Sequence, residues 1–357
     1  MDIKEIAIRE VFMKKNVLLF SHQLKVGGAP TVLCEMGKIL KKMYNVVVLS
    51  PSDGAMRQQF EKNGMEVLIS GEITDALRDV IVQKFDFVVA NTTLALPFVI
   101  KFADKITIYW WIHENTLVYE GRQGMKEYYQ IASKYAKIFS AGHIAADNFY
   151  HFYKIKTEIL EFGLADSYVA KKDTRRHEYI NVICPSTICE LKGQDILVDA
   201  IKRMDTELRK KCKFIFLGEP RNDNRKECEM IERLTEEYEN VKFDHLLERE
   251  KLLELYYDMD VVIAPSREDA TPATIVEGLM YHKICVCSSG TGVSRYLEDG
   301  RNGFVFENKN VDDLSDKLEY IVCNFEKLGK LREQGRSVYE KIYSYEIFEK
   351  NVLKLMA

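Results

Sequence analysis

The feature that most constrains the fold is a series of short, almost uninterrupted apolar runs separated by segments with helical spacing. The runs form two series of five: 16–21, 45–50, 85–91, 106–113 and 137–142, then 179–186, 213–218, 240–243, 260–266 and 284–289. Strands buried on both faces of a parallel sheet have this pattern, whereas strands with one wet face alternate apolar and polar residues. Strand and helix patterns that alternate along a chain predict an α/β protein with parallel sheets.

The break between the two series divides the chain of 357 residues into two domains, which agrees with a typical size of about 150 residues per domain. The segment 163–178, GLADSYVAKKDTRRHE, is polar and charged, and we interpret it as a linker. We therefore predict two Rossmann-like, doubly wound domains, 1–165 and 166–340, that face a central cleft. A C-terminal helix within 341–357 is expected to pack back toward the first domain.

Composition excludes several classes of protein. A net charge of −4 is far from the basic bias of a nucleic-acid-binding surface, so no nucleic-acid partner is expected. The eight cysteines form no C-x-x-C pair, and several lie in apolar runs, which indicates reduced, buried thiols in a cytoplasmic protein. The chain shows no cysteine–histidine metal motif and no signal peptide, and no apolar run approaches the roughly 18 residues of a membrane span.

Ligands of open parallel sheets bind beyond the carboxyl ends of the strands, so the residues that follow the runs are the candidates. The first run is followed by SHQLKVGGAP, in which Gly27 and Gly28 precede Pro30 at a predicted helix start. Glycines there let a ligand approach the backbone, and a helix N-terminus offers N–H groups to an anion. The pattern is not G-x-G-x-x-G, and a Gly-Gly turn before a helix also has a purely structural explanation.

The run 106–113 ends in WWIHENT, which places His113 and Glu114 directly after a strand. A histidine in that position can hydrogen-bond a ligand hydroxyl or accept a proton. The alternative is a structural histidine in a partly buried site. The two tryptophans lie inside the apolar run, so we assign them to the core rather than to a stacking platform.

Lys192 and Gly193 follow the first strand of the second series, at a predicted helix start. A lysine beside a helix N-terminus can bind a diphosphate as a point charge. An exposed lysine in a loop, without a functional role, is the alternative.

The stretch EDATPATIVEG comes directly after the apolar run DVVIAPS. Thr271 is a natural N-cap and Pro272 a natural first helical residue, so we predict a helix that starts there. Its first turn carries no charge, so backbone N–H groups remain available to an anion. These are the N–H groups of Thr271, Ala273 and Thr274. Glu277 then lies in the second turn.

With these pieces in place, the chain resembles the retaining glycosyltransferases of family 4, whose GT-B fold has two Rossmann-like domains. The resemblance covers nearly the whole chain and rests on SHQLKVGGAPTVLCEMGKILKK, on LKGQDILVDAI and on DMDVVIAPSREDATPATIVEGLMYHKICVCSSGTGVSRYLEDGRNGFVFE. The last block is the specific one. The family signature there is an acid, seven residues and a glutamate, followed by a strand, a Gly-rich turn and D-G-x-N-G.

The resemblance implies a nucleotide-sugar donor and assigns roles toward it. Gly27 and Gly28 would let backbone amides meet the distal phosphate, and Lys192 would contact the diphosphate. Glu277 would accept hydrogen bonds from the ribose hydroxyls. Lysine and helix N–H groups would stabilise the departing nucleoside diphosphate, so no metal and no other cofactor is expected.

The remaining implied roles concern the transferred sugar. Asp269 has seven residues between it and Glu277, as in the family signature, and we predict that it holds hydroxyls of the donor sugar. Glu268 has eight and takes this role if the loop bulges by one residue. His113 would lie near the reacting centre, and we identify no covalent nucleophile.

The chain departs from the family pattern before the lysine. The family has Gly-Arg where this chain has Ser186 and Thr187. Thr187 can donate one neutral hydrogen bond to the diphosphate, whereas arginine would bring a charged fork. Our hypothesis is that Arg267 or Arg221 supplies the missing charge.

The resemblance implies transfer of a sugar to a hydroxyl of a glycan or lipid-linked acceptor, with retention, in bacterial cell-surface polysaccharide synthesis. Two alternatives stay open: a catalytically weak nucleotide-sugar-binding or scaffold protein, which Thr187 favours, and a nucleotide-sugar epimerase. The expected location is the cytoplasm, with a possible peripheral contact at the inner face of the membrane through the basic helix around Lys38, Lys41 and Lys42. The segment DHLLERE after the run 240–243 is a candidate wall for the base.

Overall fold

The protein is described by a computed structural model that covers residues 14–170, 178–221, 225–245 and 247–356. The chain folds as two units. Unit 1 comprises Met1–Ala141, Ala145–Phe162 and Glu349–Ala357, and unit 2 comprises Gly142–Ile144 and Gly163–Phe348, as far as these residues are described. Residues 171–177 of the predicted linker and residue 246 of the candidate base wall lie outside the described chain.

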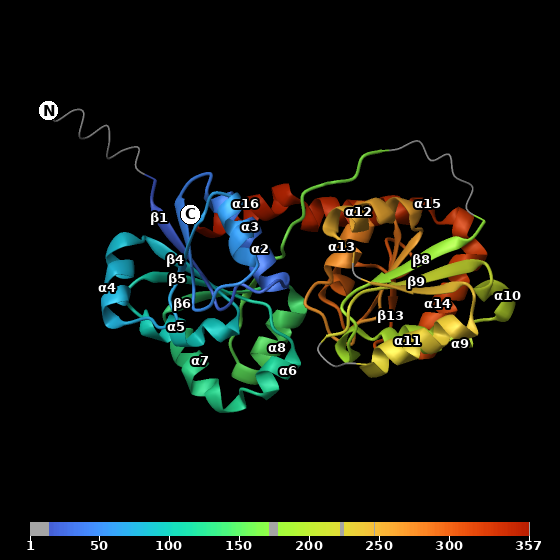
Figure 1. The fold of residues 1–357 in the computed structure, drawn as a ribbon, viewed down its shortest axis with the longest axis horizontal. Coiled ribbons are helices and arrows are strands. Elements are labelled where there is room, and N and C mark those ends of the chain that lie inside the picture. Colours follow the sequence, from blue (N-terminus) through green and yellow to red (C-terminus); the bar gives the residue numbers. More distant parts are fainter. Residues whose placement is uncertain (1–13, 171–177, 222–224, 246, 357) are drawn as a thin grey trace. The chain divides into compact units, whose positions relative to one another are not determined.

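Unit 1 contains a seven-stranded sheet in the order β3-β2-β1-β4-β5-β6-β7 (Figure 1). The strands are β1 (Asn16–Ser21), β2 (Asn45–Ser50), β3 (Glu66–Ile69), β4 (Phe87–Asn91), β5 (Thr107–Ile112), β6 (Ala136–Ser140) and β7 (Glu158–Ile159). Every neighbouring pair is parallel. The order grows outward in both directions from β1 and β4, which is the arrangement of a Rossmann-like domain.

Unit 2 contains a six-stranded sheet in the order β10-β9-β8-β11-β12-β13. The strands are β8 (Ile180–Pro185), β9 (Cys212–Leu217), β10 (Val241–Asp244), β11 (Val261–Ala264), β12 (Ile284–Ser288) and β13 (Phe304–Phe306). All pairs are again parallel. The prediction of two Rossmann-like, parallel-sheet domains is confirmed.

Helices cover both faces of each sheet. Those of the first half are α2 (Gly28–Leu40), α3 (Met56–Lys62), α4 (Asp75–Lys84), α5 (Leu96–Lys101), α6 (Thr116–Glu120), α7 (Lys126–Ala132) and α8 (His143–Tyr153). Those of the second half are α9 (Gln194–Arg203), α10 (Thr206–Arg209), α11 (Arg225–Glu237), α12 (Arg249–Asp258), α13 (Ala273–Met280), α14 (Val311–Asn324), α15 (Gly329–Val338) and α16 (Tyr345–Met356). In Figure 1, α12, α13 and α15 lie on one side of the unit 2 sheet, and α9, α11 and α14 lie on the other.

Each of the ten apolar runs contains a strand, but the sequence pattern missed β3, β7 and β13. These strands have four, two and three residues. Three of the four residues of β3 and both residues of β7 are exposed, so these strands make no continuous apolar run. They lie at sheet edges, where burial on both faces is not required.

The tryptophans of β5 belong to the core of unit 1, as predicted. Trp110 and Trp111 are 0% and 1% exposed. Their indole N–H groups donate to backbone carbonyls of Thr92 at 2.6 Å and Leu160 at 3.2 Å, so neither leaves a polar atom unsatisfied.

All eight cysteines are free thiols, and six of them are buried. Burial raises the pKa of Cys34 to about 11 and that of Cys184 to about 12. These thiols therefore stay protonated and act as small core residues. Among the described residues, every helix is too short or too polar to cross a bilayer.

The three lysines of the predicted membrane contact, of which Lys38 lies in α2 and the other two follow its end, are all engaged within unit 1. Lys38 pairs with Glu35 at 2.6 Å, Lys41 donates to the Asn63 carbonyl at 2.8 Å, and Lys42 pairs with Glu349 at 2.6 Å. The last of these contacts joins Glu349 of α16, which belongs to unit 1, to the turn after α2.

Close packing of α13 on its sheet leads to the first testable prediction. A Cβ on Gly278 would lie 2.8 Å from Cys285 Sγ and 3.0 Å from Val262 Cβ, so Gly278→Ala should destabilise unit 2 by about 1–3 kcal/mol. Gly329→Ala is the matched control, because nothing lies within 4 Å of its Cβ position at the start of α15. Denaturation followed by far-UV circular dichroism should show a lower midpoint for Gly278→Ala, and equal midpoints would contradict the packing argument.

Candidate functional site

The parallel sheet of unit 2 brings the predicted residues to one edge, where its strands end. Thr187 and Lys192 follow β8, and the acidic loop that begins at Glu268 follows β11. The carboxyl ends of parallel strands lie on the same edge, so segments about 80 residues apart in sequence become neighbours.

At this edge the ammonium of Lys192 forms an ion pair and hydrogen bond with the carboxylate of Asp269. The Lys192 side chain keeps 28% of its exposure and Asp269 keeps 13%, so the pair is reachable from solvent. Burial lowers the pKa of Lys192, but the adjacent Asp269 carboxylate more than offsets this, and the net pKa lies above its usual value. The lysine is therefore a permanent cation.

The turn after β12 fixes the position of Asp269. Its N–H donates to the Gly290 carbonyl at 3.1 Å, and its carbonyl accepts from Gly292 N–H at 2.9 Å. Side chains on these glycines would collide with the carbonyls of Arg267 and Ala270. The Gly-rich turn predicted from SSGTGVS thus serves to bring two loops into contact.

Lys192 is positioned by the glycine that follows it. Gly193 has a φ of +69° and links the short helical turn η3 (Glu190–Lys192) to α9. A Cβ there would collide with the Pro265 carbonyl as well as strain the backbone. Gly193 therefore sets the direction in which the lysine leaves the chain.

Arg267 braces the same turn and is not available as an additional free cation. Its guanidinium donates to both carboxylate oxygens of Asp195, at 2.7 and 2.5 Å, and to the Glu190 carbonyl at 2.6 Å. The ion pair with Asp195 raises the pKa of Arg267. The geometry assigns Arg267 to holding the Lys192 turn in place.

Arg221 is the better placed of the two arginines. A backbone bridge joins the loops after β8 and β9, because Ile188 N–H donates to the Glu219 carbonyl at 2.8 Å and Arg221 N–H to the Ile188 carbonyl at 3.0 Å. The charge of Arg221 acts on Lys192, whose pKa it lowers slightly. The Arg221 side chain is exposed, whereas Thr187, at the family's arginine position, offers no charge.

The helix of the acidic stretch begins one residue later than predicted. Thr271 is not its N-cap: the hydroxyl donates to the Ala270 carbonyl at 2.7 Å, and Pro272 takes the cap position with φ −66° and ψ 109°. The Pro272 carbonyl accepts the first helical bond, from Ile275 N–H at 3.0 Å, so the extended ψ of the proline displaces the start. α13 has no side-chain cap and no acid in its first turn, and the availability of the N–H groups of Thr271, Ala273 and Thr274 to an anion stays a prediction.

Glu277 is deeply buried, at 1% exposure. Its two carboxylate oxygens accept from the Arg249 guanidinium and, at 2.8 Å, from the Tyr256 hydroxyl. Sequence reasoning missed both partners, although Arg249 belongs to the segment predicted as the base wall. Glu268, the fallback acid, lies in the same loop as Asp269 and is partly exposed.

Unit 1 presents Gly27 and Gly28 at the start of α2. Gly27 is the N-cap in extended conformation, with φ 172°, and no side chain caps the helix. A Cβ on Gly27 would lie 4.0 Å from the nearest atom outside its chain neighbours, and one on Gly28 would have nothing within 4 Å. The packing of unit 1 thus leaves open space beside both glycines, and their role toward a ligand stays a prediction.

His113 lies at the carboxyl edge of unit 1, and its tautomer follows from its neighbour. Asn91 Nδ2 donates to the Ala29 carbonyl at 2.9 Å, which leaves Asn91 Oδ1 to accept from His113 Nε2 at 2.8 Å. His113 Nδ1 is then the unprotonated nitrogen and can accept a hydrogen bond. Burial, reinforced by the nearby His22, lowers the pKa of His113 to about 3, so it is a neutral acceptor and a weak base.

Two more residues at this edge, His22 and Thr92, were not singled out as candidates from the sequence, and Glu114 was named there beside His113 without a role. His22 Nδ1 meets the Thr92 hydroxyl at 2.8 Å, and burial lowers the pKa of His22. Thr92 has a φ of +73°, which is rare for a threonine and is often found at functional sites. The Glu114 carboxylate accepts from the N–H groups of Thr93 at 2.6 Å and His113 at 2.9 Å. The position of His22 directly after the first apolar run was the available signal.

A pocket of about 410 Å³ opens at the same edge of unit 1. Its lining includes Phe20, His22, Ile73, Leu94, Phe98 and Lys101. The rings of Phe20 and Phe98 stack with centroids 3.9 Å apart, so one wall is aromatic, and Lys101 adds a cation. Unit 1 can therefore hold a ligand that is partly apolar.

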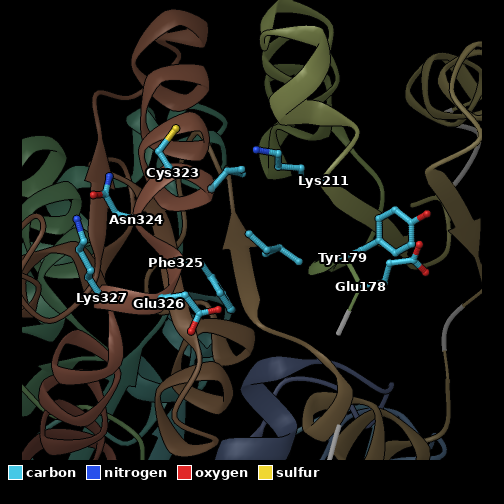
Figure 2. A pocket seen from close by; sticks show the side chains of 10 residues that line it. Glu178, Tyr179, Lys211, Cys323, Asn324, Phe325, Glu326 and Lys327 are labelled. Carbon is cyan, nitrogen blue, oxygen red and sulfur yellow. The ribbon is translucent and has the colours of Figure 1, made fainter. Parts of the chain in front are cut away.

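A second pocket, of about 280 Å³, lies at the opposite edge of the unit 2 sheet (Figure 2). Tyr179 and Lys211 line it from the amino ends of β8 and β9, and Cys323 and Phe325 line it from the end of α14. None of the predicted site residues belongs to it. Among the described residues, no group of three or more histidine, cysteine, aspartate or glutamate side chains is arranged to bind a metal.

Two family models match the sequence. The model described as "Glycosyl transferases group 1" matches residues 169–338, and "Glycosyl-transferase family 4" matches residues 13–140. Together they cover most of the chain; the first contains the whole unit 2 sheet, and the second contains β1 to β6 of the unit 1 sheet. The chain belongs to the group 1 glycosyltransferases of family 4.

Solved glycosyltransferase structures share the fold over almost the whole chain. Anabaena HepE, in complex with UDP and glucose, matches with a TM-score of 0.81 at 18% identity, covering 96% of this glycosyltransferase and 99% of HepE. WaaG, a glycosyltransferase involved in lipopolysaccharide biosynthesis, matches with a TM-score of 0.70 at 14% identity. The match covers 94% of this chain and 98% of WaaG. At these identities the likeness establishes the GT-B fold alone.

Two curated relatives match shorter segments. An uncharacterized glycosyltransferase of Methanocaldococcus jannaschii is 28% identical over 158 residues, which are 43% of this glycosyltransferase and 41% of the relative. The poly(ribitol-phosphate) alpha-N-acetylglucosaminyltransferase of Staphylococcus aureus is 26% identical over 95 residues, 26% of this chain and 19% of the relative. The glycosyltransferase thus spans less than half the length of either relative.

The buried, neutral His113 predicts how unit 1 of the glycosyltransferase responds to acid. The pKa of His113 in the folded chain, about 3, lies below the ordinary value of 6.5. Between pH 3 and pH 6.5 this histidine is therefore protonated in the unfolded chain and neutral in the folded chain. Stability is therefore lost as pH falls below about 6.5, by up to about 1.4 kcal/mol per pH unit. Glu114 has a raised pKa because of burial and acts in the opposite sense, but it is present in both proteins compared.

The measurement is urea unfolding of wild type and His113→Gln between pH 7 and pH 5, followed by tryptophan fluorescence. Both tryptophans lie in β5, so the signal reports on unit 1. The variant should lose less stability on acidification than the wild type. Parallel pH profiles would show that His113 is not held neutral.

Proposed function

We propose that the protein transfers a sugar from a nucleoside-diphosphate-sugar donor to a hydroxyl of a glycan or lipid-linked acceptor, with retention of anomeric configuration. We place this reaction in bacterial cell-surface polysaccharide synthesis. One observation carries the proposal: the Lys192–Asp269 pair lies at the sheet edge where the uncapped helix α13 begins, and Glu277 lies one turn further on. A cation, an anion-binding helix start and two carboxylates are the groups such a donor requires.

The Lys192–Asp269 pair matches the junction between diphosphate and sugar in the donor. The ammonium suits the diphosphate as a point charge, and the carboxylate suits sugar hydroxyls as an acceptor-only group. Their mutual contact directs both side chains to the same place before the donor arrives. Binding then replaces one charge-assisted contact by two.

Departure of the nucleoside diphosphate requires stabilisation of its growing negative charge. Lys192 and the N–H groups of Ala273 and Thr274 supply this stabilisation as fixed, preorganised donors. We therefore propose a reaction that needs no metal. Turnover should be unchanged by a chelator, and loss of activity with EDTA that Mg²⁺ or Mn²⁺ restores would refute this part.

We assign the acceptor to unit 1. The aromatic pocket beside His22 can hold the apolar part of a lipid-linked acceptor, and the unprotonated Nδ1 of His113 can accept a hydrogen bond from a hydroxyl. Gly27 and Gly28 leave the start of α2 open to phosphate oxygens. Family membership supports retention, and we assign no covalent nucleophile.

The decisive experiment is incubation with a panel of nucleotide sugars and detection of released nucleoside diphosphate. UDP-glucose is the first donor to test, because the similar HepE structures hold UDP, glucose or UDP-glucose. Release that depends on an added acceptor supports transfer. Binding without release would support a scaffold, and conversion to an isomeric donor would support an epimerase.

Two substitutions test which of the two acids, Asp269 or Glu268, holds the donor sugar. Asp269→Asn should lower transfer by about 10²-fold, since it removes a charged acceptor aimed at the reacting sugar. Glu268→Gln, one residue earlier in the same loop, is the matched control and should stay within a few-fold of wild type. The reverse pattern would assign the donor sugar to Glu268.

Two arginine substitutions test which cation replaces the family's arginine, whose position Thr187 occupies. Arg221→Ala should weaken nucleoside diphosphate binding by about tenfold, the size of one charge-assisted contact, and should leave thermal stability unchanged. Arg267→Ala should lower the melting temperature, because Asp195 loses its partner. If donor affinity is unaffected in Arg221→Ala, Arg221 does not replace the family's arginine.

A further inference from the structure

Glu277 is held by two side chains of one helix. Arg249 is the first residue of α12, and Tyr256 lies seven residues on, so both project from the same face toward α13. Arg249 donates to Glu277 Oε1, and the Tyr256 hydroxyl donates to Oε2 at 2.8 Å. One helix therefore orients both oxygens of a carboxylate that is 1% exposed.

Arg249 is the cation that pairs with this buried carboxylate. Burial of a carboxylate disfavours its charge unless the group is paired and hydrogen-bonded. The other titratable groups around it are Tyr256, Tyr281 of the segment after α13, and Cys285 of β12, whose pKa values are all raised, chiefly by burial. These three groups are neutral at ordinary pH, so the positive charge comes from Arg249.

The contacts leave part of the carboxylate open to a further ligand. Each carboxylate oxygen can accept two hydrogen bonds, and Arg249 and Tyr256 each supply one of them, to different oxygens. The Arg249 side chain is itself 49% exposed, so the outer side of the pair reaches the surface. The two remaining acceptor positions equal in number the two hydroxyls of a ribose diol.

We propose that Arg249 is a positioning residue for the donor, which keeps Glu277 ionised and oriented so that both of its oxygens accept from the ribose 2′- and 3′-hydroxyls. The inference rests on the proposed nucleotide-sugar donor. Arg249 remains in place when the nucleotide binds and does not compete with it. Preference for ribose over deoxyribose thus depends on a residue outside the acid-x₇-glutamate signature.

Removal of Arg249 should change how ribonucleotide affinity depends on pH in a defined direction. Without the guanidinium, burial favours the protonated carboxyl of Glu277 over the carboxylate. As pH falls, the carboxylate then takes up a proton and loses an acceptor position. Affinity for a ribonucleotide should then fall as pH decreases. The wild type should show a flatter pH dependence over the same range, because Arg249 keeps the carboxylate charged.

The test is calorimetric binding of UDP, GDP and ADP and of their 2′-deoxy counterparts to wild type and Arg249→Gln, at pH 8 and pH 5.5. Wild type should prefer the ribonucleotide by about tenfold or more at both pH values, as expected for a hydrogen bond to a charged group. Arg249→Gln should lose most of this preference at pH 5.5 and retain more of it at pH 8. Arg249→Lys, which restores the charge, should recover the preference at pH 5.5.

Controls separate this role from a structural one. Arg233→Gln removes an arginine of α11 that is 74% exposed, and it should leave binding and the ribose preference unchanged. Tyr256→Phe keeps the cation and removes one hydrogen bond, so it should weaken the ribose preference equally at both pH values. Tyr256→Phe also serves as the test if Arg249→Gln does not fold. If Tyr256→Phe loses the ribose preference more at pH 5.5 than at pH 8, the assignment of the charge to Arg249 is wrong.

The outcomes distinguish this inference from the proposed function. If wild type binds none of the three nucleoside diphosphates, the proposed donor is wrong and the inference falls with it. If wild type binds one of them and Arg249→Gln keeps the same ribose preference at pH 5.5, the inference alone is wrong. Tighter ribonucleotide binding by Arg249→Gln would show that Arg249 competes with the ribose, and would also overturn the inference.

Discussion

Parallel pairing of strands that are buried on both faces is the constraint on which the rest of this protein depends. Each strand must be followed by a crossover, and helices then cover both faces of the sheet. As a result every strand ends at the same edge, and the loops that follow β8 and β11 meet there. The contact between Lys192 and Asp269, 77 residues apart, is a consequence of this pairing.

The loops at this edge come together because several residues lack side chains. Gly193, Gly290 and Gly292 each occupy a position where a Cβ would collide with a backbone carbonyl. Arg267 then ties the turn before α9 to the acidic loop through Asp195 and backbone oxygens. The lysine and the carboxylate are thus held by backbone contacts and by a second ion pair, and their preorganisation does not depend on a ligand.

The ionisable groups at the carboxyl edges of the two sheets differ in their charge. In unit 2 the buried charges are paired: Lys192 with Asp269, and Glu277 with Arg249. In unit 1 burial lowers the pKa values of His22 and His113 and favours the neutral rings, which hydrogen-bond to Thr92 and Asn91. A paired, charged edge suits a diphosphate, and a neutral edge beside an aromatic pocket suits hydroxyls and apolar groups. This contrast is the physical argument behind our proposal that unit 2 binds the donor and unit 1 the acceptor.

The sequence by itself determined the two parallel sheets, their central strands and the strand-end loops that carry candidates, because burial on both faces leaves a local apolar signature. It did not reveal the edge strands β3, β7 and β13, which make no long apolar run, or the start of α13, where the ψ of Pro272 overrides the capping preference of Thr271. Only the tertiary structure decided the partners: Asp269 for Lys192, Asp195 for Arg267, and Arg249 with Tyr256 for Glu277. Such pairings join residues that are distant in sequence, and local patterns carry no information about which charges burial will bring together.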